Sequence, residues 1–461
     1  MMRTTDDEIR IADADFPKPF RNGLEFNAPV HGTWNIVHIG LQMPEAIQIY
    51  VCARNCMRGV ILTAAEMKES ERFSFVILDE KDMVRENIDR ATIEGVADVI
   101  EKRTRAGVRP RAIQLFTVCV HHFLGTDYKQ LYRSLEERFP DIDFYRCYMD
   151  PIMQKKGYTP DQKLRYAMYE KLPQCSPNRR VISLLGSDFA LDESSDLVSH
   201  IRERGFELRQ ARCCKSYEEF LRLSEANLFI AVYPAARYGV EAAARRLGRE
   251  FLYLPGSFDG ELIDLQLKQL EDYMSRFGAL TEADHRKEKE EENADILLAG
   301  QRLKQKLGDI PLCLDATVHP RVLGLARLLT EMGMRVEKIY LDAMNGDEAG
   351  DYEWLRLHTP DLILSASIHV KKRRYVTRLY RQKAFEDPDA TEKAPLRKIA
   401  VGQKAAYFEQ TPYFVNMVNG FGLYGRDGIV RMLEAISDAA DSAKDIEDIV
   451  PRKGLGCESC L

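Results

Sequence analysis

The sequence predicts an α/β protein built from three units, each a parallel β-sheet covered by helices. Short apolar runs, such as residues 112–119 (AIQLFTVC) and 181–186 (VISLLG), alternate with longer amphipathic stretches along the chain. Apolar strands that alternate with such helices are typical of parallel sheets buried on both faces. The 461 residues and the number of apolar runs fit three such units better than one very wide sheet.

Each predicted strand is a short run rich in β-branched, aromatic and other apolar side chains. In chain order, the strands are expected at residues 73–79, 112–119, 144–149, 181–186, 228–233, 251–254, 312–315, 336–341, 362–365 and 398–401. The predicted helices instead repeat their apolar residues at helical spacing. They are expected at residues 87–105, 128–139, 195–204, 217–225, 239–247, 321–332 and 428–444.

Two connections divide the chain. Residues 173–180 (PQCSPNRR) form a proline-punctuated polar link before a new strand. Residues 261–307 form a long helical region whose charged run at 281–293 predicts a solvated helix or linker. We therefore expect an N-terminal domain at 1–177, a middle domain at 178–308, a C-terminal domain at 309–450 and a flexible tail at 451–461.

Composition argues against two classes of partner. The net charge of −6 leaves no general basic field of the kind that attracts nucleic acid. No apolar run is long enough to span a membrane. Residues 1–16 (MMRTTDDEIRIADADF) lack the apolar core of a signal peptide, so we expect a cytoplasmic protein.

Nucleotide-binding motifs are weak. No GxxxxGK[ST] loop is present, so the chain should not hydrolyse ATP through a P-loop. A GxGxxG occurs at 420–425, but no second strand with a ribose-binding acid can follow it, which favours a glycine-rich turn at a domain junction. The basic run at 371–383 (KKRRYVTRLYRQK) is interpreted as a solvated surface, with an anionic ligand or an acidic partner as the alternative.

The cysteines carry the clearest chemical signal. A reducing cytosol disfavours structural disulfides, so clustered cysteines there are more often metal ligands or catalytic thiols. Cys52 and Cys56 would share one face if the segment is helical. The nearby charges of Arg54 and Arg58 would lower their thiol pKa values and stabilise an anionic cluster. The alternative is a pair of packed helix cysteines.

A second group of candidate ligands follows a predicted strand. Cys119 stands at the carboxyl end of that strand, where parallel α/β sheets bind ligands. His121 and His122 add possible nitrogen ligands or proton donors, and the alternative for each is a buried, hydrogen-bonded histidine. Cys457 and Cys460 form a CxxC in the tail that could be a redox pair, a metal-delivery handle or unassigned.

The stretch from residue 27 to 151 resembles the N-terminal domain of the nitrogenase component 1 family. Residues 117–127 (TVCVHHFLGTD) are similar to the family's strand, cysteine and glycine-containing turn that ends in aspartate. Cys52 and Cys56 resemble its first cluster-binding region, and residues 143–151 (DFYRCYMDP) resemble the strand that follows. A weaker likeness continues at 233–255, 319–340, 361–369 and 414–440.

The resemblance implies three Rossmann-like domains and an inter-subunit iron–sulfur cluster, expected to be [4Fe–4S], held by Cys52, Cys56 and Cys119. It also implies a homologous or identical component 1 subunit as partner, and a separate ATP-dependent iron protein as electron donor. His121 or His122 would donate protons. Nothing matches the cysteine and late histidine that hold nitrogenase's molybdenum cofactor, so dinitrogen reduction is not expected.

The sequence therefore predicts a subunit of a nitrogenase-like reductase with an unknown substrate. A non-enzymatic scaffold for assembly of a metal cofactor is the main alternative, since the same fold could hold and hand on a nascent cofactor. A third interpretation makes the cysteines structural and the chain a small-molecule-binding α/β protein.

Overall fold

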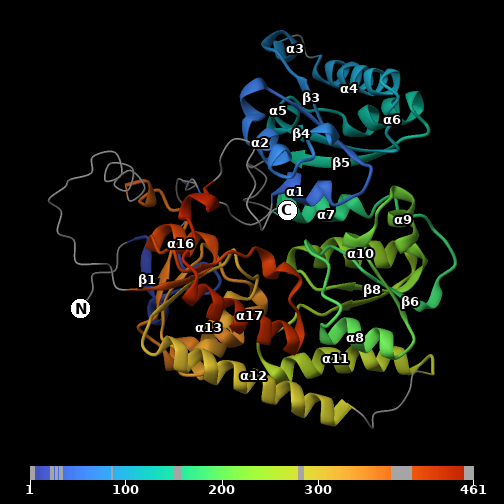
Figure 1. Cartoon of the computed structure of the whole chain (residues 1–461). Coiled ribbons are helices and arrows are strands. Elements are labelled where there is room, and N and C mark those ends of the chain that lie inside the picture. The colour runs from blue at the N-terminus through green and yellow to red at the C-terminus, as the bar shows by residue number, and fades with distance from the viewer. Residues whose placement is uncertain are drawn as a thin grey trace.

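The computed structural model consists of three α/β lobes, which confirms the predicted fold class (Figure 1). It describes residues 6–20, 25, 30, 35–84, 87–149, 157–278, 285–374 and 397–450. Each lobe is organised around one sheet, and parallel pairing predominates throughout. The positions of the domain limits remain a prediction.

The first sheet has the order β3 (Phe73–Ile77), β2 (Ile47–Cys52), β4 (Ala112–Val118) and β5 (Asp143–Met149), all parallel. Every residue of β2 and β4 is buried, as expected for central strands covered on both faces. The helices around it are α1 (Ile36–Leu41), α2 (Arg58–Glu66), α3 (Glu80–Val84), α4 (Ile88–Arg105), α5 (Cys119–Phe123), α6 (Tyr128–Arg138) and α7 (Pro160–Met168).

The second sheet has the order β7 (Glu207–Gln210), β6 (Asn178–Leu184), β8 (Ala226–Ala231) and β9 (Glu250–Tyr253). Its strands are also parallel. The surrounding helices are α8 (Asp196–Glu203), α9 (Tyr217–Leu221), α10 (Arg237–Leu247) and α11 (Gly260–Ser275).

The third sheet unites both ends of the described chain. Its order is β1 (Glu8–Arg10), β12 (Ile363–Ser365), β11 (Val336–Tyr340), β10 (Leu312–Asp315), β13 (Ile399–Val401) and β14 (Phe414–Val415). Its helices are α12 (His285–Leu307), α13 (Val322–Glu331), α14 (Ala349–His358), α16 (Gln403–Glu409) and α17 (Gly425–Asp441). β1 pairs antiparallel with β12, a contact across more than three hundred residues that the sequence did not predict.

The condition under which Cys52 and Cys56 would share one helix face is not met. Their segment is not a continuous helix, because Cys52 ends strand β2 and Cys56 ends a short 3-10 turn, Arg54–Cys56. The run Ile47–Cys52 (IQIYVC) lies between β3 and β4, where its alternate side chains are buried against both layers of helices. Tertiary burial on both faces therefore selects a strand.

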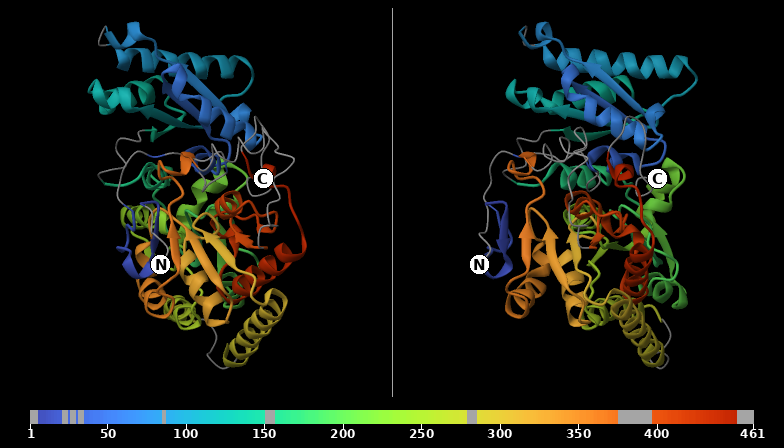
Figure 2. Two further views of the ribbon diagram at one scale, coloured as in Figure 1. Left: turned by 90° about the vertical axis from the view of Figure 1, so that its left-hand side faces the viewer. Right: turned by 60° about the vertical axis from the view of Figure 1, so that its left-hand side comes forward.

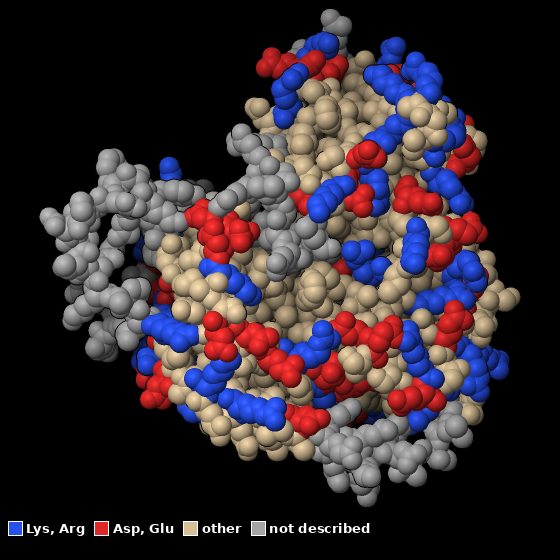
Figure 3. Space-filling model, viewed as in Figure 1, with Lys and Arg blue, Asp and Glu red and all other residues tan. Residues whose placement is uncertain are grey.

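The N-terminal lobe lies above the other two lobes, which lie side by side (Figures 1 and 2). Its helices α1 and α7 are on the side that faces those two lobes (Figure 1). Lys and Arg side chains intersperse with Asp and Glu side chains over one face of the molecule (Figure 3). Among the described residues, no helix combines the length and apolarity needed to cross a bilayer.

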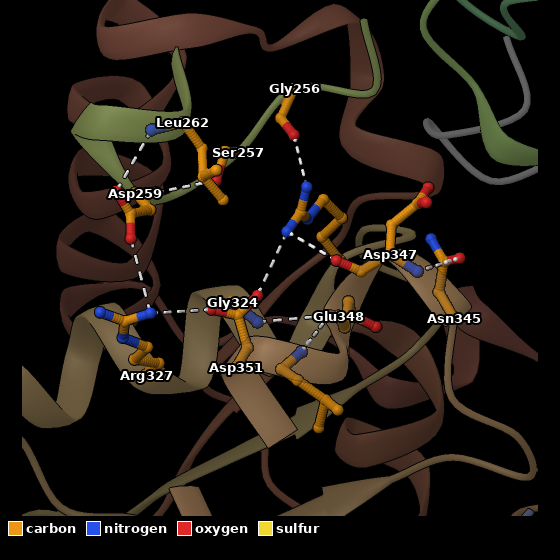
Figure 4. Close-up of polar contacts among 12 residues, drawn as sticks. Gly256, Ser257, Asp259, Leu262, Gly324, Arg327, Asn345, Asp347, Glu348 and Asp351 are labelled. Atoms are coloured by element: carbon orange, nitrogen blue, oxygen red, sulfur yellow. Dashed lines mark hydrogen bonds and ion pairs between the residues drawn. The ribbon is translucent and has the colours of Figure 1, made fainter. Parts of the chain in front are cut away.

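Arg321 connects the middle lobe to the C-terminal lobe by contacts with Gly256 and Asp351, two residues that Figure 4 labels together with Glu348 and Gly324. Its guanidinium donates to the Gly256 carbonyl at 2.9 Å and to Asp351 at 3.2 Å. Glu348 lies beside it and accepts from the backbone N–H groups of Leu323 (2.6 Å) and Gly324 (3.2 Å), at the start of α13. Burial raises the pKa of Glu348 to about 8. These contacts fix the relative position of two lobes whose loops meet at an internal cavity.

Candidate functional site: the cysteine edge and the lobe junction

Cys52, Cys56 and Cys119 lie at the carboxyl edge of the first sheet. Strands β2 and β4 are parallel neighbours with Val51 opposite Thr117, so Cys52 and Cys119 both lie where these strands end. Cys56 follows β2 in the 3-10 turn that leads into α2. Ligand sites of parallel α/β sheets lie at this edge. We call this region the cysteine edge.

The three thiols differ in exposure. Cys52 is 0 % exposed and packs within an apolar core. Burial, followed by the nearby Cys56, raises the pKa of Cys52 to about 12. Cys56 is exposed, and Cys119 is partly exposed at the start of α5. A metal ligand must be deprotonated and reachable, so Cys56 and Cys119 are better suited to bind metal than Cys52.

The described part of one chain does not present a complete metal site. Within the described ranges, no three His, Cys, Asp or Glu side chains gather as a possible metal-binding group. Iron–sulfur clusters are commonly held by four thiolates, more than the two accessible thiols of the cysteine edge. Asp150, which could supply a further ligand, and the tail cysteines Cys457 and Cys460 lie outside the described residues.

His121 is buried, and both nitrogens of its ring have partners within the protein. The Val118 N–H donates to its Nδ1 at 3.3 Å, so the ring proton lies on Nε2, which contacts Thr92 Oγ1 at 3.0 Å. The Thr92 hydroxyl in turn donates to the Ile88 carbonyl at 2.8 Å. Burial lowers the pKa of His121 to about 4. The residue is fully buried, and this arrangement fits a neutral histidine that anchors the Cys119 turn to α4.

His122 is exposed at the same turn. Its side chain lines a hollow of about 430 Å³ between α6, α7 and the edge strand β5. Of the two predicted proton donors, His122 alone therefore faces a space that a second molecule can enter. Adjacent histidines on a short helix point in different directions, which accounts for the contrast.

The junction of the three lobes contains a buried ionic network that the sequence did not predict. Arg165 of α7 donates to Asp161 and to Asp188, each at 2.6 Å. Gln42, after α1, donates to Asp188 at 3.2 Å, and Asn419 donates to its other oxygen at 2.5 Å. The four segments come from all three lobes. Their separation in sequence explains why no local pattern predicts the network.

A small cavity of about 60 Å³ adjoins this junction, between the middle and C-terminal lobes. His319 lines it and accepts the Arg321 N–H at Nδ1 (3.0 Å), which leaves the ring proton on Nε2. Burial, together with the charge of Arg321, lowers the pKa of His319 to about 3. Asn419 and Phe421 adopt positive φ values of 49° and 46° in the facing loop, and such strained residues cluster at functional sites.

The GxGxxG motif forms this loop, in agreement with the interpretation as a glycine-rich turn at a domain junction. Gly422 has a φ of 83°, and a Cβ there would lie 2.2 Å from the Ala190 carbonyl oxygen. The glycine therefore permits the close approach of the loop to the middle lobe.

Comparison with known proteins decides the family. A sequence model described as "Nitrogenase component 1 type Oxidoreductase" matches residues 37–375. The chain belongs to this family. Two solved structures similar to this nitrogenase component 1 type chain are described as "Nitrogenase Cp1 at pH 6.5" and "Nitrogenase Cp1 at pH 5".

The first structure has a TM-score of 0.63 and 11 % identity, and the match covers 91 % of this chain and 94 % of that one. The second has a TM-score of 0.58 and 12 % identity, and it covers 94 % of each chain. At such low identity, the likeness establishes the three-lobed fold. No curated protein sequence matches this component 1 type chain significantly.

Proposed function

We propose that the chain is an iron–sulfur-binding subunit of a nitrogenase-like reductase. The observation that carries the proposal is the position of Cys56 and Cys119, both accessible at the carboxyl edge of one parallel sheet, in a member of an oxidoreductase family. The bound cluster, proposed to be [4Fe–4S], would supply the one-electron redox chemistry. The electrons would come from an ATP-dependent iron protein, and the substrate is unknown.

Cys119 and Cys56 are the proposed ligands from this chain. Their thiols are reachable, whereas the Cys52 thiol faces apolar side chains. Cys52 would become a third ligand only if the turn at residues 53–56 moved. A homologous or identical component 1 subunit would complete the ligand set, because the described part of one chain holds no ready group of three ligands. The chain is proposed to act in the cytoplasm.

His122 is the proposed proton donor of this chain. Its ring lines an accessible hollow, whereas both ring nitrogens of His121 are already occupied. His121 would instead hold the Cys119 turn in place. Its hydrogen bonds to the turn and to Thr92 fit that positioning role.

Anaerobic preparation tests the proposal. The chain, expressed with iron–sulfur assembly proteins and its gene neighbours, should contain iron and sulfide and give a paramagnetic signal after reduction. Cys119→Ala should lose the iron while circular dichroism stays unchanged. Cys313→Ala is the matched control, because Cys313 is buried in β10 of another lobe, and it should keep the iron. Iron-free wild-type protein, or iron retained in Cys119→Ala, would refute the assignment.

A scaffold for assembly of a metal cofactor is the second candidate function. The CxxC of Cys457 and Cys460 favours it, because a closely spaced pair of thiols can hand over a metal. Deletion of residues 451–461 separates the two functions. A scaffold should lose cluster transfer to an acceptor protein, whereas a reductase should keep its iron content and its turnover.

A further inference from the structure

The hollow beside β5 is the larger of the two spaces that adjoin the candidate sites, at about 430 Å³ against about 60 Å³ for the cavity at the lobe junction. Among the described residues, β5 is an edge strand of the first sheet, and no further described strand pairs with its outer side. Helices α6, α7 and α10 provide the walls. Its volume falls in the range of small-molecule pockets. We call it the tyrosine pocket, after Tyr128, Tyr148, Tyr158, Tyr166 and Tyr238, which line it.

Three of these rings form a stacked wall. The ring centroids of Tyr158 and Tyr238 lie 3.7 Å apart with an interplanar angle of 18°. Those of Tyr166 and Tyr238 lie 5.3 Å apart at 19°. Tyr158 is 44 % exposed, although a large aromatic ring is usually buried. An exposed stack of flat rings is a surface on which another ring can pack.

Four of the five tyrosine hydroxyls of the pocket are available to a ligand. Within the described residues, the hydroxyls of Tyr148, Tyr158, Tyr166 and Tyr238 have no hydrogen-bond partner in the protein. Other tyrosines of the chain are engaged, as in the 2.6 Å contact between the hydroxyls of Tyr145 and Tyr217. A phenolic hydroxyl can donate to an anionic oxygen.

Two cationic side chains also face the pocket. Lys163 of α7 has its Nζ 5.6 Å from the centre of the Tyr148 ring, and Arg146 of β5 has its guanidinium 5.0 Å from the Tyr132 ring. Neither forms an ion pair within the part of the chain that the structure describes. Glu170 is the acidic residue of the lining, and burial raises its pKa. The lining thus has more positive than negative side chains.

We propose that the tyrosine pocket binds a small ring-bearing organic anion, a carboxylate or a phosphate ester. The stacked tyrosines would hold the ring, while Lys163, Arg146 and the free hydroxyls would hold the anionic group through charge-assisted hydrogen bonds. Binding does not depend on an iron–sulfur cluster. Because His122 lines the pocket and belongs to the same short helix as Cys119, the ligand would also be the substrate of the reductase, and that second step rests on the proposed function.

Calorimetric titration of the iron-free chain tests the binding site. Two matched pairs of probes differ mainly in the anionic group: benzoate with benzyl alcohol, and adenosine monophosphate with adenosine. At least one anion should bind with a Kd below about 1 mM and about tenfold more tightly than its neutral counterpart. The pair that shows this difference distinguishes a carboxylate from a phosphate ligand.

Variants locate the binding. Lys163→Met should weaken binding of the anion about tenfold, and Tyr158→Leu should weaken both members of the pair by removing the exposed ring. Lys129→Met is the matched control, because Lys129 is an exposed lysine next to Tyr128 that does not line the pocket. Circular dichroism confirms that each variant is folded. No binding by either anion, equal binding of charged and neutral probes, or equal effects of Lys163→Met and Lys129→Met would overturn the proposal.

Discussion

The cysteine edge and the Arg165 junction both lie at the carboxyl ends of parallel strands, but their polar groups are satisfied in different ways. At the junction, which follows β6, Asp188 accepts from Arg165, Gln42 and Asn419. At the cysteine edge, Cys56 is exposed and Cys119 is partly exposed, and neither thiol has a partner among the described residues. At the junction, the polar groups bind one another. At the cysteine edge, the accessible thiols remain free to bind a ligand.

The carboxyl ends of the parallel strands therefore serve two purposes in this chain: one holds the lobes together, and the other presents reactive thiols. Buried charges that are paired and hydrogen-bonded fix how three lobes dock, because leaving one without its partner is costly. Accessible thiols contribute little to docking and remain available for chemistry. Substitutions at the junction should therefore change stability, and substitutions at the edge should change iron content.

The largest expected effect on stability is at the junction. Arg165→Met would leave the buried Asp188 and the partly exposed Asp161 without their cation, and should lower the free energy of unfolding by about 3–5 kcal/mol. Chemical denaturation followed by circular dichroism measures the loss. Arg245→Met is the control, because Arg245 pairs with Glu241 at the surface, and it should cost less than about 1 kcal/mol. Similar losses in both variants would show that the junction does not hold the lobes.

His121 offers a test within the cysteine edge itself. The pKa of its buried ring is lowered from 6.5 to about 4, so the unfolded chain takes up a proton at a higher pH than the folded chain. The stabilisation is complete above pH 6.5 and is lost as the pH falls towards 4. The free energy of unfolding should fall by about 2–3 kcal/mol more in wild type than in His121→Gln over this window.

Urea denaturation at several pH values between 7.5 and 4 measures this difference. His122→Gln is the control, since His122 is exposed, and it should retain the pH dependence of wild type. If His121→Gln also retains that dependence, the ring is not held neutral by burial, and His121 becomes available again as a proton donor.

The sequence predicted the architecture well because the signal for it is local. The run AIQLFTVC became β4 within one residue of the expected limits, and VISLLG overlaps β6, which begins three residues earlier than expected. An apolar run between amphipathic helices is typically a buried strand of a parallel sheet. The short strands β7 and β14 and the pairing of β1 with β12 depend on distant segments. Local periodicity does not contain that information.

The candidate site was predicted less completely, because burial decides the role of neighbouring residues. His121 and His122 are adjacent, yet one is buried and hydrogen-bonded and the other faces the tyrosine pocket. Cys52 and Cys56 look equivalent in the sequence, but the end of β2 falls between them. Family resemblance predicted ligands at this edge, and the three-dimensional structure separates the accessible thiols from the buried one.

The smallest effects on stability are expected for the two cysteines at the end of β2. Cys52→Ala removes a sulfur from an apolar core and should cost about 1 kcal/mol, while most of the iron should be retained. Cys56→Ala removes an exposed side chain and should cost less than about 0.5 kcal/mol, while the iron should be lost. Denaturation and iron analysis of the same two preparations measure both quantities.

This crossed pattern, in which the more destabilising substitution is the one that keeps the iron, distinguishes a core cysteine from a ligand. Loss of iron in both variants would instead make Cys52 the third ligand, and would mean that its side chain leaves the apolar core when the cluster binds. In that case Cys52→Ala should also destabilise the iron-loaded protein more than the iron-free protein, because a residue that binds only in the loaded state adds its binding free energy to that state alone.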